Sequence, residues 1–463
     1  MKVKFSFILA SLFLIAGICG CNKMLEVPPS PLALTSDNVY ETNAAAASVL
    51  TGVYTAISSG NMQLGQSIDA ISMVSGLSAD ELTLYGGAAN FNAILVQYYE
   101  NRLNSGLSTS NSGTIWSELY SDIYIVNIAM ERLESSTSVT SAVRRQLLGE
   151  AKFLRAFFYF YLVNLYGSVP LTTSSDYTAN SSLAKASVQQ VYHQIVADLV
   201  GAQSELSDGY VASDALTGTA ERVRPNKWAA TALLARAYLY SQNWDSSRVV
   251  ATEIINHSSL YQLDSLNGVF LKNSTEAIWQ LQPVNAGWNT QDAKIFVLPA
   301  SGPTSNSVNY PVYLSPGLLS RFELNDRRRM DWVDSVIVNG TVYYFPYKYK
   351  SATLYTPVTE YTMVLRLGEQ YLIRAEAEAN LGGAFLDSAR DDLNVIRQRA
   401  GLADYAGPID QFSMKASILH ERKIELFTEW GHRWLDLKRT ASIDSVMSNV
   451  APMKSSTWCL DPL

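Results

Sequence analysis

Three glutamates near the C-terminal end of the sequence recur at every fourth position. Glu421, Glu425 and Glu429 would share one face of a helix, and a glycosidase needs two carboxylates that flank the bond it cleaves. Productive carboxylates are about 5 to 9.5 Å apart, and the general acid is desolvated. Glu429 also precedes Arg433 by four residues, the spacing at which a helix pairs opposite charges. We therefore expect these charges to tie helices together, and we predict no catalytic residues.

Other patterns of catalysis and metal binding are missing from the sequence. There is no Gly-x-Ser-x-Gly elbow and no glycine-rich phosphate loop. The histidines show no metal-ligand spacing; they are His193, His257, His420 and His432. We expect no metal, no cofactor and no enzymatic activity, although a helical-barrel glycosidase stays open as a weaker alternative.

Three loops instead carry residues that suit a sugar. Saccharide rings present apolar C–H faces and hydroxyl edges, so their binding sites combine flat aromatic side chains with amides or carboxylates. Core packing is the alternative role for each ring. The predicted ligand-binding residues are Asp80, Tyr85, Asn90 and Phe91 in the first loop, Trp288 and Asn289 in the second, and Tyr310 and Tyr313 in the third.

Much of the chain has the apolar periodicity of amphipathic helices. Between residues 147 and 165, for example, apolar side chains follow one another at spacings of three and four, and Gly167 and Pro170 then end the helix. Two helix pairs, turning at Gln242–Trp244 and at Gly382–Gly383, resemble tetratricopeptide units. The predicted helices include Ala44–Ile57, Ile115–Leu133, Ser141–Tyr166, Ser187–Leu206, Asn226–Tyr240 and Asp245–Asn256. The tryptophans in helical motifs are expected in the core; they are Trp228, Trp244 and Trp434.

The helical pattern fades between Tyr261 and Tyr361. This stretch contains 16 aromatic residues among 101, a higher density than the 11% of the whole chain. Within it, Asn339 and Gly340 separate two runs of strand-forming residues, and Asn-Gly favours a two-residue type I′ turn. We therefore predict a loop-rich region with at least one β-hairpin and with some rings facing solvent or ligand.

The N-terminus has the pattern of a bacterial lipoprotein signal. Lys2 and Lys4 precede an apolar run from Phe5 to Ile18, which is short for a membrane span, and Cys21 follows. We predict a signal peptide over residues 1–20, acylation of Cys21, and an extended polar arm over 21–42. Loss of Lys2 and Lys4 changes the net charge from −7 to −9, which makes nucleic acid a poor partner. No disulfide framework remains.

Six sequence motifs, in order along the chain, match motifs of one protein family. They are SADEL at 78–82, the FLRA, LYG and VPL words within 150–171, DRRR at 326–329, RLGEQYLIRAEA at 366–377, LNVIRQRAGL at 393–402 and ERKIELFTEWGHRWLDLKR at 421–439. Together they resemble the SusD/RagB family of outer-membrane nutrient-binding lipoproteins.

This resemblance implies a mostly α-helical protein with a SusD-like fold. Residues 43–463 would form a single domain, with a tetratricopeptide-like scaffold at 114–257 and 365–440 and an irregular, loop-rich ligand lobe with short β-hairpins at about 60–113 and 258–364. The implied function is capture of an oligosaccharide or other nutrient at the outer surface and its delivery to a SusC-like TonB-dependent transporter. A lipid anchor would hold the protein on the outer membrane, facing the exterior. A tetratricopeptide-type adaptor that binds only protein remains the second hypothesis.

Overall fold

The computed structural model describes residues 39–60, 62, 67–103 and 114–450 of the chain. The predicted signal peptide and the predicted acylation site, Cys21, lie outside the described residues, as does most of the predicted arm. None of the helices in the described part has both the length and the hydrophobicity needed to cross a bilayer.

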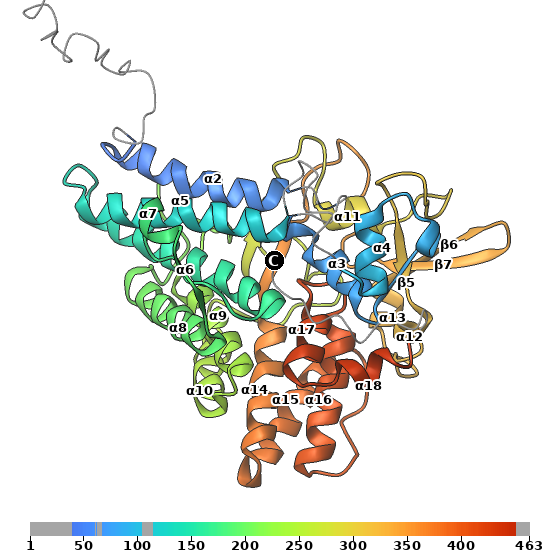
Figure 1. The fold of residues 1–463 in the computed structure, drawn as a ribbon. Coiled ribbons are helices and arrows are strands. Elements are labelled where there is room, and N and C mark those ends of the chain that lie inside the picture. Colours follow the sequence, from blue (N-terminus) through green and yellow to red (C-terminus); the bar gives the residue numbers. More distant parts are fainter. Residues whose placement is uncertain (1–38, 61, 63–66, 104–113, 451–463) are drawn as a thin grey trace, which may run out of the picture.

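Helices dominate the structure, which confirms the prediction of a mostly α protein (Figure 1). The longest helix, α6, is flanked in space by α5 and α8, and further pairs link α8 to α9, α9 to α10 and α10 to α14. These helices run in a curved array down one side of the molecule to α14, α15 and α16. The helices are α2 (Asn43–Ser59), α3 (Ile71–Ser78), α4 (Ala93–Glu100), α5 (Ile115–Ser135), α6 (Ser141–Tyr166), α7 (Tyr177–Asn180), α8 (Val188–Glu205), α9 (Lys227–Tyr240), α10 (Trp244–Ile255), α11 (Gln291–Phe296), α12 (Pro316–Leu319), α13 (Arg328–Asp331), α14 (Leu367–Leu381), α15 (Leu386–Arg399), α16 (Gln411–Glu425), α17 (His432–Arg439) and α18 (Ile443–Met447), with short 3-10 turns η3 (Ile68–Ala70), η4 (Gly87–Ala89) and η6 (Gly383–Phe385).

The six predicted helices before residue 257 and both predicted helix pairs are present. Helices α9 and α10 form the first pair, and the chain reverses at Gln242, whose φ is +61°. Helices α14 and α15 form the second, and Gly382 and Gly383 supply the positive φ angles of that turn. Trp434 is buried, and Trp228 and Trp244 are partly buried against the core, as predicted.

Helix α6 lies at the centre of the core because it is apolar on nearly every face. All residues from Phe153 to Val163 are buried. The Phe153 and Phe157 rings meet the Trp279 ring edge to face, with centroids 4.9 and 5.2 Å apart. Trp279 belongs to a strand in the other half of the chain, so aromatic packing joins the helical scaffold to the loop-rich lobe.

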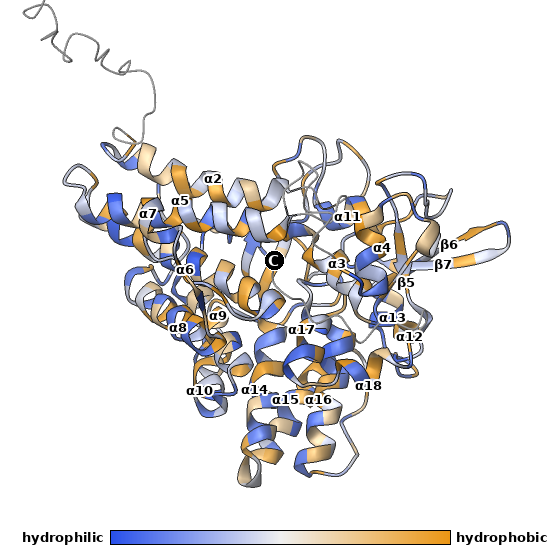
Figure 2. Cartoon of the chain, in the orientation of Figure 1, coloured by the Kyte–Doolittle hydropathy of each residue, from blue (hydrophilic) through white to orange (hydrophobic). Residues whose placement is uncertain are grey.

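The described residues form four pairs of short antiparallel strands, three in the loop-rich lobe and one between helices of the scaffold. The predicted Asn-Gly hairpin is one of them, and Asn339 and Gly340 adopt φ angles of +50° and +81° in its turn. The hairpin projects from the body in Figure 1, and Figure 2 shows hydrophobic residues along its strands. The pairs are β1 (Leu82–Leu84) with β5 (Val312–Leu314), β2 (Val169–Pro170) with β3 (Lys185–Ala186), β4 (Ala277–Leu281) with β8 (Thr362–Arg366), and β6 (Val333–Val338) with β7 (Thr341–Pro346).

Two helices lie in a region that the sequence predicts as loops. Every residue of α3 is buried, so this helix lacks the polar face that would reveal it as amphipathic. Helix α4 has only eight residues, and the Asn92 side chain caps it by accepting hydrogen bonds from the backbone N–H groups of Ile94 and Leu95. Both helices hold the first predicted ligand loop between them.

Candidate functional site

Two of the predicted ligand loops meet through the pairing of β1 with β5. Thr83 lies opposite Tyr313 in this pair, and the backbone N–H of Tyr85 donates to the Pro311 carbonyl at 2.8 Å. Leu82, Leu84, Val312 and Leu314 point into the core, so strand alternation directs Thr83 and Tyr313 to the outer face. Segments about 230 residues apart in the sequence thus present Tyr85 and Tyr313 side by side.

The β6–β7 hairpin brings a third ring to the same place. The Tyr343 ring of β7 lies 5.7 Å from that of Tyr85 and 5.2 Å from that of Tyr313, with interplanar angles of 77° and 82°. All three rings are partly exposed. We call Tyr85, Tyr313 and Tyr343 the tyrosine cluster. Partial burial and the neighbouring tyrosines raise the pKa values of Tyr313 and Tyr343, so their hydroxyl groups stay protonated near neutral pH.

The loop after Tyr85 extends the cluster with a further exposed ring. Phe91 is 54% exposed, and its backbone N–H donates to the Ser305 carbonyl at 3.0 Å. Gly86 approaches Ser305 so closely that a Cβ at residue 86 would lie 2.7 Å from the Ser305 Cβ. Tyr310 is partly buried at the base of the facing loop, where its carbonyl accepts from the Thr304 N–H at 3.0 Å. The loops around the cluster therefore support one another.

The side chain of Asn90, a predicted ligand contact, forms hydrogen bonds within its own loop. Its side-chain amide donates to the Tyr85 carbonyl at 2.9 Å, and its Oδ1 accepts from the Asn92 N–H at 2.9 Å. The residue is only 6% exposed. Asn90 therefore fixes the loop that carries Tyr85 and Phe91, and we remove it from the candidate site.

The side chain of Asp80 likewise forms ion pairs within the protein. Its carboxylate pairs with Lys423 Nζ at 2.7 Å and with Arg433 Nε at 2.7 Å. Burial would raise the pKa of Asp80, but Arg433 and Lys423 outweigh burial and hold that pKa below its usual value. This carboxylate anchors the start of the first ligand loop to the C-terminal helices, so it too leaves the candidate site.

Trp288 and Asn289 lie on a different loop, and no ring contact within the described chain joins Trp288 to the tyrosine cluster. The Trp288 ring is partly exposed and has the Lys294 ammonium 5.4 Å from its centroid. Tyr355, which is 83% exposed, donates its backbone N–H to the neighbouring Gly287 carbonyl. Asn289 is 1% exposed, and its Oδ1 accepts from the Thr359 and Glu360 N–H groups, so this side chain holds two loops together and we leave it out of the candidate site.

The geometry suits noncovalent recognition. The tyrosine cluster offers ring faces for C–H groups and hydroxyl groups for a polyol edge, while Phe91 adds apolar surface. No group of histidine, cysteine or acidic residues in the described ranges is arranged to hold a metal ion.

Two family models match this chain over separate regions. One, described as starch-binding and associating with the outer membrane, matches residues 75–239, and the other, described as the SusD family, matches residues 334–455. SusD-like protein P25 of Formosa agariphila is 25% identical, and the alignment covers 97% of this chain and 92% of that protein. A SusD-like protein of Bacteroides ovatus is 23% identical over 71% of this chain and 65% of the relative.

The chain belongs to the SusD/RagB family. Solved structures agree in fold. A SusD superfamily protein from Bacteroides vulgatus superposes with a TM-score of 0.75 at 21% identity, covering 89% of this chain and 91% of that structure. A laminarin-binding SusD-like protein gives a TM-score of 0.70 at 22% identity, covering 89% of this chain and 94% of that structure.

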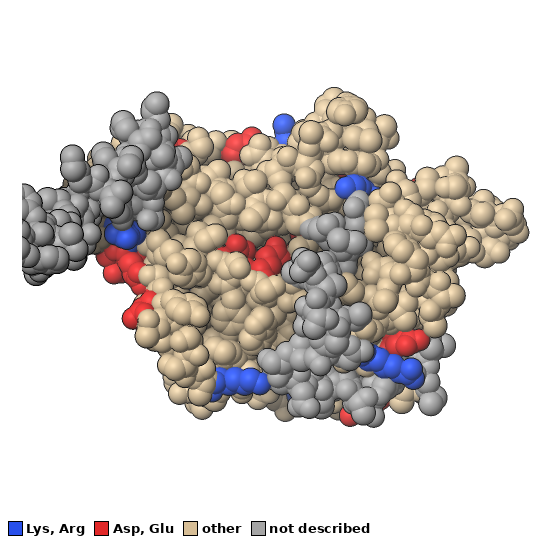
Figure 3. Space-filling view, turned by 45° about the horizontal axis from the view of Figure 1, so that its top comes forward, with Lys and Arg blue, Asp and Glu red and all other residues tan. Residues whose placement is uncertain are grey.

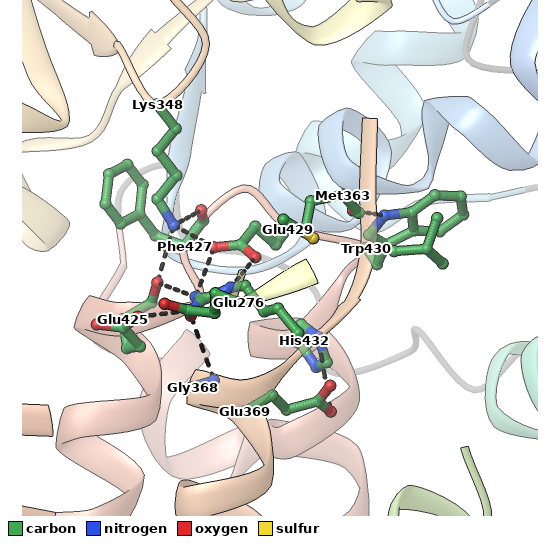
Figure 4. Close-up of polar contacts among 12 residues, drawn as sticks. Glu276, Lys348, Met363, Gly368, Glu369, Glu425, Phe427, Glu429, Trp430 and His432 are labelled. Carbon is green, nitrogen blue, oxygen red and sulfur yellow. Dashed lines mark hydrogen bonds and ion pairs between the residues drawn. The ribbon is translucent and has the colours of Figure 1, made fainter. Parts of the chain in front are cut away.

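The charged motifs of this SusD/RagB protein converge in its interior. Figure 4 shows the carboxylates of Glu276, Glu425 and Glu429 pointing toward one another. Arg366 lies among them, with ion pairs of 2.9 Å to Glu276, 2.6 Å to Glu425 and 2.8 Å to Glu429. Lys348 adds a 2.5 Å pair to Glu429. We call these five residues the buried ion network; it joins both lobes.

These contacts bear on whether the glutamates of this SusD/RagB protein could act as a pair of catalytic carboxylates. Burial would raise the pKa of Glu425, but Arg399, Arg366 and Arg328 outweigh it and hold that pKa well below its usual value. Burial is likewise outweighed at Glu429 by Arg366 and Lys348. Both carboxylates are therefore charged and paired within the protein. A general acid must instead carry a proton, which requires a raised pKa.

The predicted pairing of Glu429 with Arg433 is wrong. Helix α16 ends at Glu425, and Thr428 and Trp430 then adopt positive φ angles of 53° and 45°. The two residues are therefore not four apart on one helix. Arg433 pairs with Asp80 instead.

Sequence reasoning missed Tyr343 of the cluster. The hairpin and its aromatic residues were visible, but strand alternation alone places Tyr343 and Tyr344 on opposite faces without saying which face meets Tyr313. That choice depends on β5 lying beside β7, a contact between separate strand pairs.

Proposed function

We propose that this SusD/RagB protein binds an oligosaccharide at the tyrosine cluster, without altering it, and delivers it to a SusC-like TonB-dependent transporter. The observation that carries the glycan part is the convergence of Tyr85, Tyr313 and Tyr343 from three separate segments into one partly exposed group. Aromatic side chains combined with hydroxyl groups match the two kinds of surface on a sugar.

Relatives with this fold support the proposal through what their names say of them. The structural neighbours include a SusD-like carbohydrate-binding protein of Bacteroides vulgatus, a laminarin-binding SusD-like protein and surface glycan-binding protein A of Bacteroides uniformis. At identities of 20 to 22%, these neighbours support only the shared fold. The evidence specific to this chain is the tyrosine cluster.

The membrane part of the proposal rests on the N-terminal sequence and the family. Residues 1–20 would be the signal peptide, Cys21 the lipid attachment site, 21–42 the arm and 43–463 one domain facing the cell exterior. Copurification of the full-length lipidated protein with a transporter from its native outer membrane tests the partnership. A Cys21→Ala variant recovered in the soluble fraction is the expected result for the anchor.

Affinity electrophoresis through gels containing soluble polysaccharides tests the glycan site. We expect at least one polysaccharide to retard the protein, and Tyr313→Ala to abolish the retardation. Tyr177→Ala is the matched control, because Tyr177 is 81% exposed on α7 in the helical scaffold. Retardation that survives Tyr313→Ala and disappears in Trp288→Ala would move the site to the Trp288 loop. A protein that binds no polysaccharide but copurifies with a soluble protein partner would favour the adaptor hypothesis.

A further inference from the structure

The three segments that build the tyrosine cluster contain no charged side chain. They are residues 82–99, 295–320 and 335–347, which together hold 57 residues without Asp, Glu, Lys, Arg or His. At the 17% charged fraction of the whole chain, 57 residues would carry about ten charges. The first two segments are separated by 195 residues and the last two by 14, so the three uncharged segments are not parts of one low-complexity stretch.

Their contacts show that these segments form one surface. Residues 82–84 pair with 312–314, and the loop at Ser305 packs on Gly86 and Phe91. Gly302 lies against Val338 and Tyr343 of the hairpin. In Figure 3 the projecting hairpin at the right and the surface next to it show no charged side chain.

The polar groups around the cluster are hydroxyls and amides. Thr83 lies opposite Tyr313 in the β1–β5 pair, and Thr341 lies two residues before Tyr343 in β7, so its side chain leaves the same face of the hairpin. Ser305 and Asn306 line the facing loop.

Arg329 is close to the hairpin in the sequence, but it lies on the face of the hairpin opposite the tyrosine cluster. Arg329 stacks over the Tyr344 ring at 4.5 Å. Tyr344 follows Tyr343 directly in β7, so the two side chains leave opposite faces of the hairpin. Arg329 therefore does not supply a counter-charge to the cluster.

We infer that the ligand of the tyrosine cluster is an uncharged saccharide, one without sulfate or carboxylate groups. This inference rests on the proposed glycan-binding function and narrows it. Sulfate and uronate groups are strongly hydrated anions, and a site that desolvates them without a paired cation loses affinity. Neutral hydroxyl edges and C–H faces need only the groups present here.

A glycan array that contains neutral and acidic oligosaccharides tests the ligand class with the full-length mature protein. Neutral members alone should bind, and Tyr313→Ala should remove that binding while Tyr177→Ala keeps it. Binding of sulfated or uronate-containing members that depends on Tyr313 overturns the inference but leaves the proposed glycan-binding function standing. A protein that binds neither class contradicts the proposed function itself, and the inference falls with it.

Salt dependence gives a second, independent readout. The dissociation constant for a neutral array hit should change less than about twofold between 20 and 500 mM NaCl, since no ion pair forms on binding. The Asn306→Lys variant places a cation on the facing loop, and it should acquire salt-sensitive binding of the sulfated form of the same glycan. A salt-sensitive neutral hit in the unmodified protein would show that charged groups contribute and would overturn the inference.

Discussion

At the residue scale, the same chemical types serve recognition or architecture according to burial. Tyr343 is a partly exposed ring beside two others, whereas Tyr159 and Tyr161 are fully buried in α6. Asp80 and Asn289 look like ligand contacts in the sequence, yet internal partners saturate both side chains. A residue type that suits a sugar therefore marks a site only when its polar atoms are free of the fold.

Tyr343 allows the ring and the hydroxyl to be separated. We expect Tyr343→Ala to weaken glycan binding by about 30-fold, which corresponds to about 2 kcal/mol for a ring at the centre of a contact. Tyr343→Phe should weaken it only about two- to threefold, because the ring stays and one hydroxyl is lost. Isothermal titration calorimetry measures both. Equal losses from the two variants would show that the hydroxyl, and not the ring face, dominates.

Arg366 tests the architectural use of charge. The Arg366→Met substitution leaves Glu276, Glu425 and Glu429 buried without their shared cation, and we expect the free energy of unfolding to fall by about 3–5 kcal/mol. Urea denaturation measures the change. Arg390→Met removes ion pairs from a partly exposed arginine to the exposed Asp387 and Asp391 on α15, and it should leave the urea midpoint unchanged. A midpoint that is equally insensitive to Arg366→Met would mean that the buried ion network contributes no stability.

At the scale of elements, short strands position what long helices support. The β1–β5 and β6–β7 pairs contain three to six residues per strand, yet they set the spacing of all three tyrosines. Helices α3 and α4 flank the first loop, and α6 provides the core against which the lobe packs.

The Asn339–Gly340 turn provides a test of the hairpin's role. Gly340→Ala forces an L side chain into a left-handed conformation, which costs about 1–2 kcal/mol. Because the hairpin projects from the body, we expect a several-fold loss of glycan affinity and faster amide hydrogen exchange in β6 and β7, with an unchanged global melting temperature. Gly209→Ala is the control, since Gly209 has no positive φ and open space around it. An unaltered affinity in Gly340→Ala would show that the turn does not set the position of Tyr343.

At the scale of the whole molecule, several carboxyl groups that are buried or partly buried near the junction of the two lobes carry raised pKa values. Burial raises the pKa of Asp69 to about 6, of Asp122 to about 7, and of Asp292 to about 7. Burial raises the pKa of Glu118 to about 8, and its neighbours Asp122 and Asp69 add to this rise. Such a group favours the folded state when protonated, so its stabilisation is complete below pH 4 and is lost as the pH rises through the folded pKa.

The melting temperature should therefore rise as the pH falls from about 8 to about 6. His432 opposes this trend below its unfolded pKa of 6.5, because burial and nearby arginines lower its folded pKa. Differential scanning fluorimetry between pH 5 and pH 8.5 measures the slope. Glu118→Gln keeps an acceptor for the Ile68 N–H and should flatten the slope, whereas a slope identical to that of the unmodified protein would assign the effect to other groups.

The sequence predicted the parts of this fold that are locally encoded. Apolar spacing placed α5, α6, α8, α9 and α10, and Asn339–Gly340 placed the hairpin turn, because each signal lies within one element. Helix α3 was not predicted because it is buried on every face and so lacks an amphipathic pattern. The tyrosine cluster was not predicted because it depends on strand pairing between segments about 230 residues apart. The uncharged runs were readable in the sequence, but only the strand pairing shows that they share one surface.

The ion pairs of Asp80 also bear on when the site can form during biosynthesis. Its partners Lys423 and Arg433 come 343 and 353 residues later in the chain. A nascent polypeptide that has already exposed Tyr85, Tyr313 and Tyr343 still lacks the cations that hold the base of the first loop. We therefore expect the proposed site to form last, and fragments that end before residue 423 should keep helical content without binding any glycan.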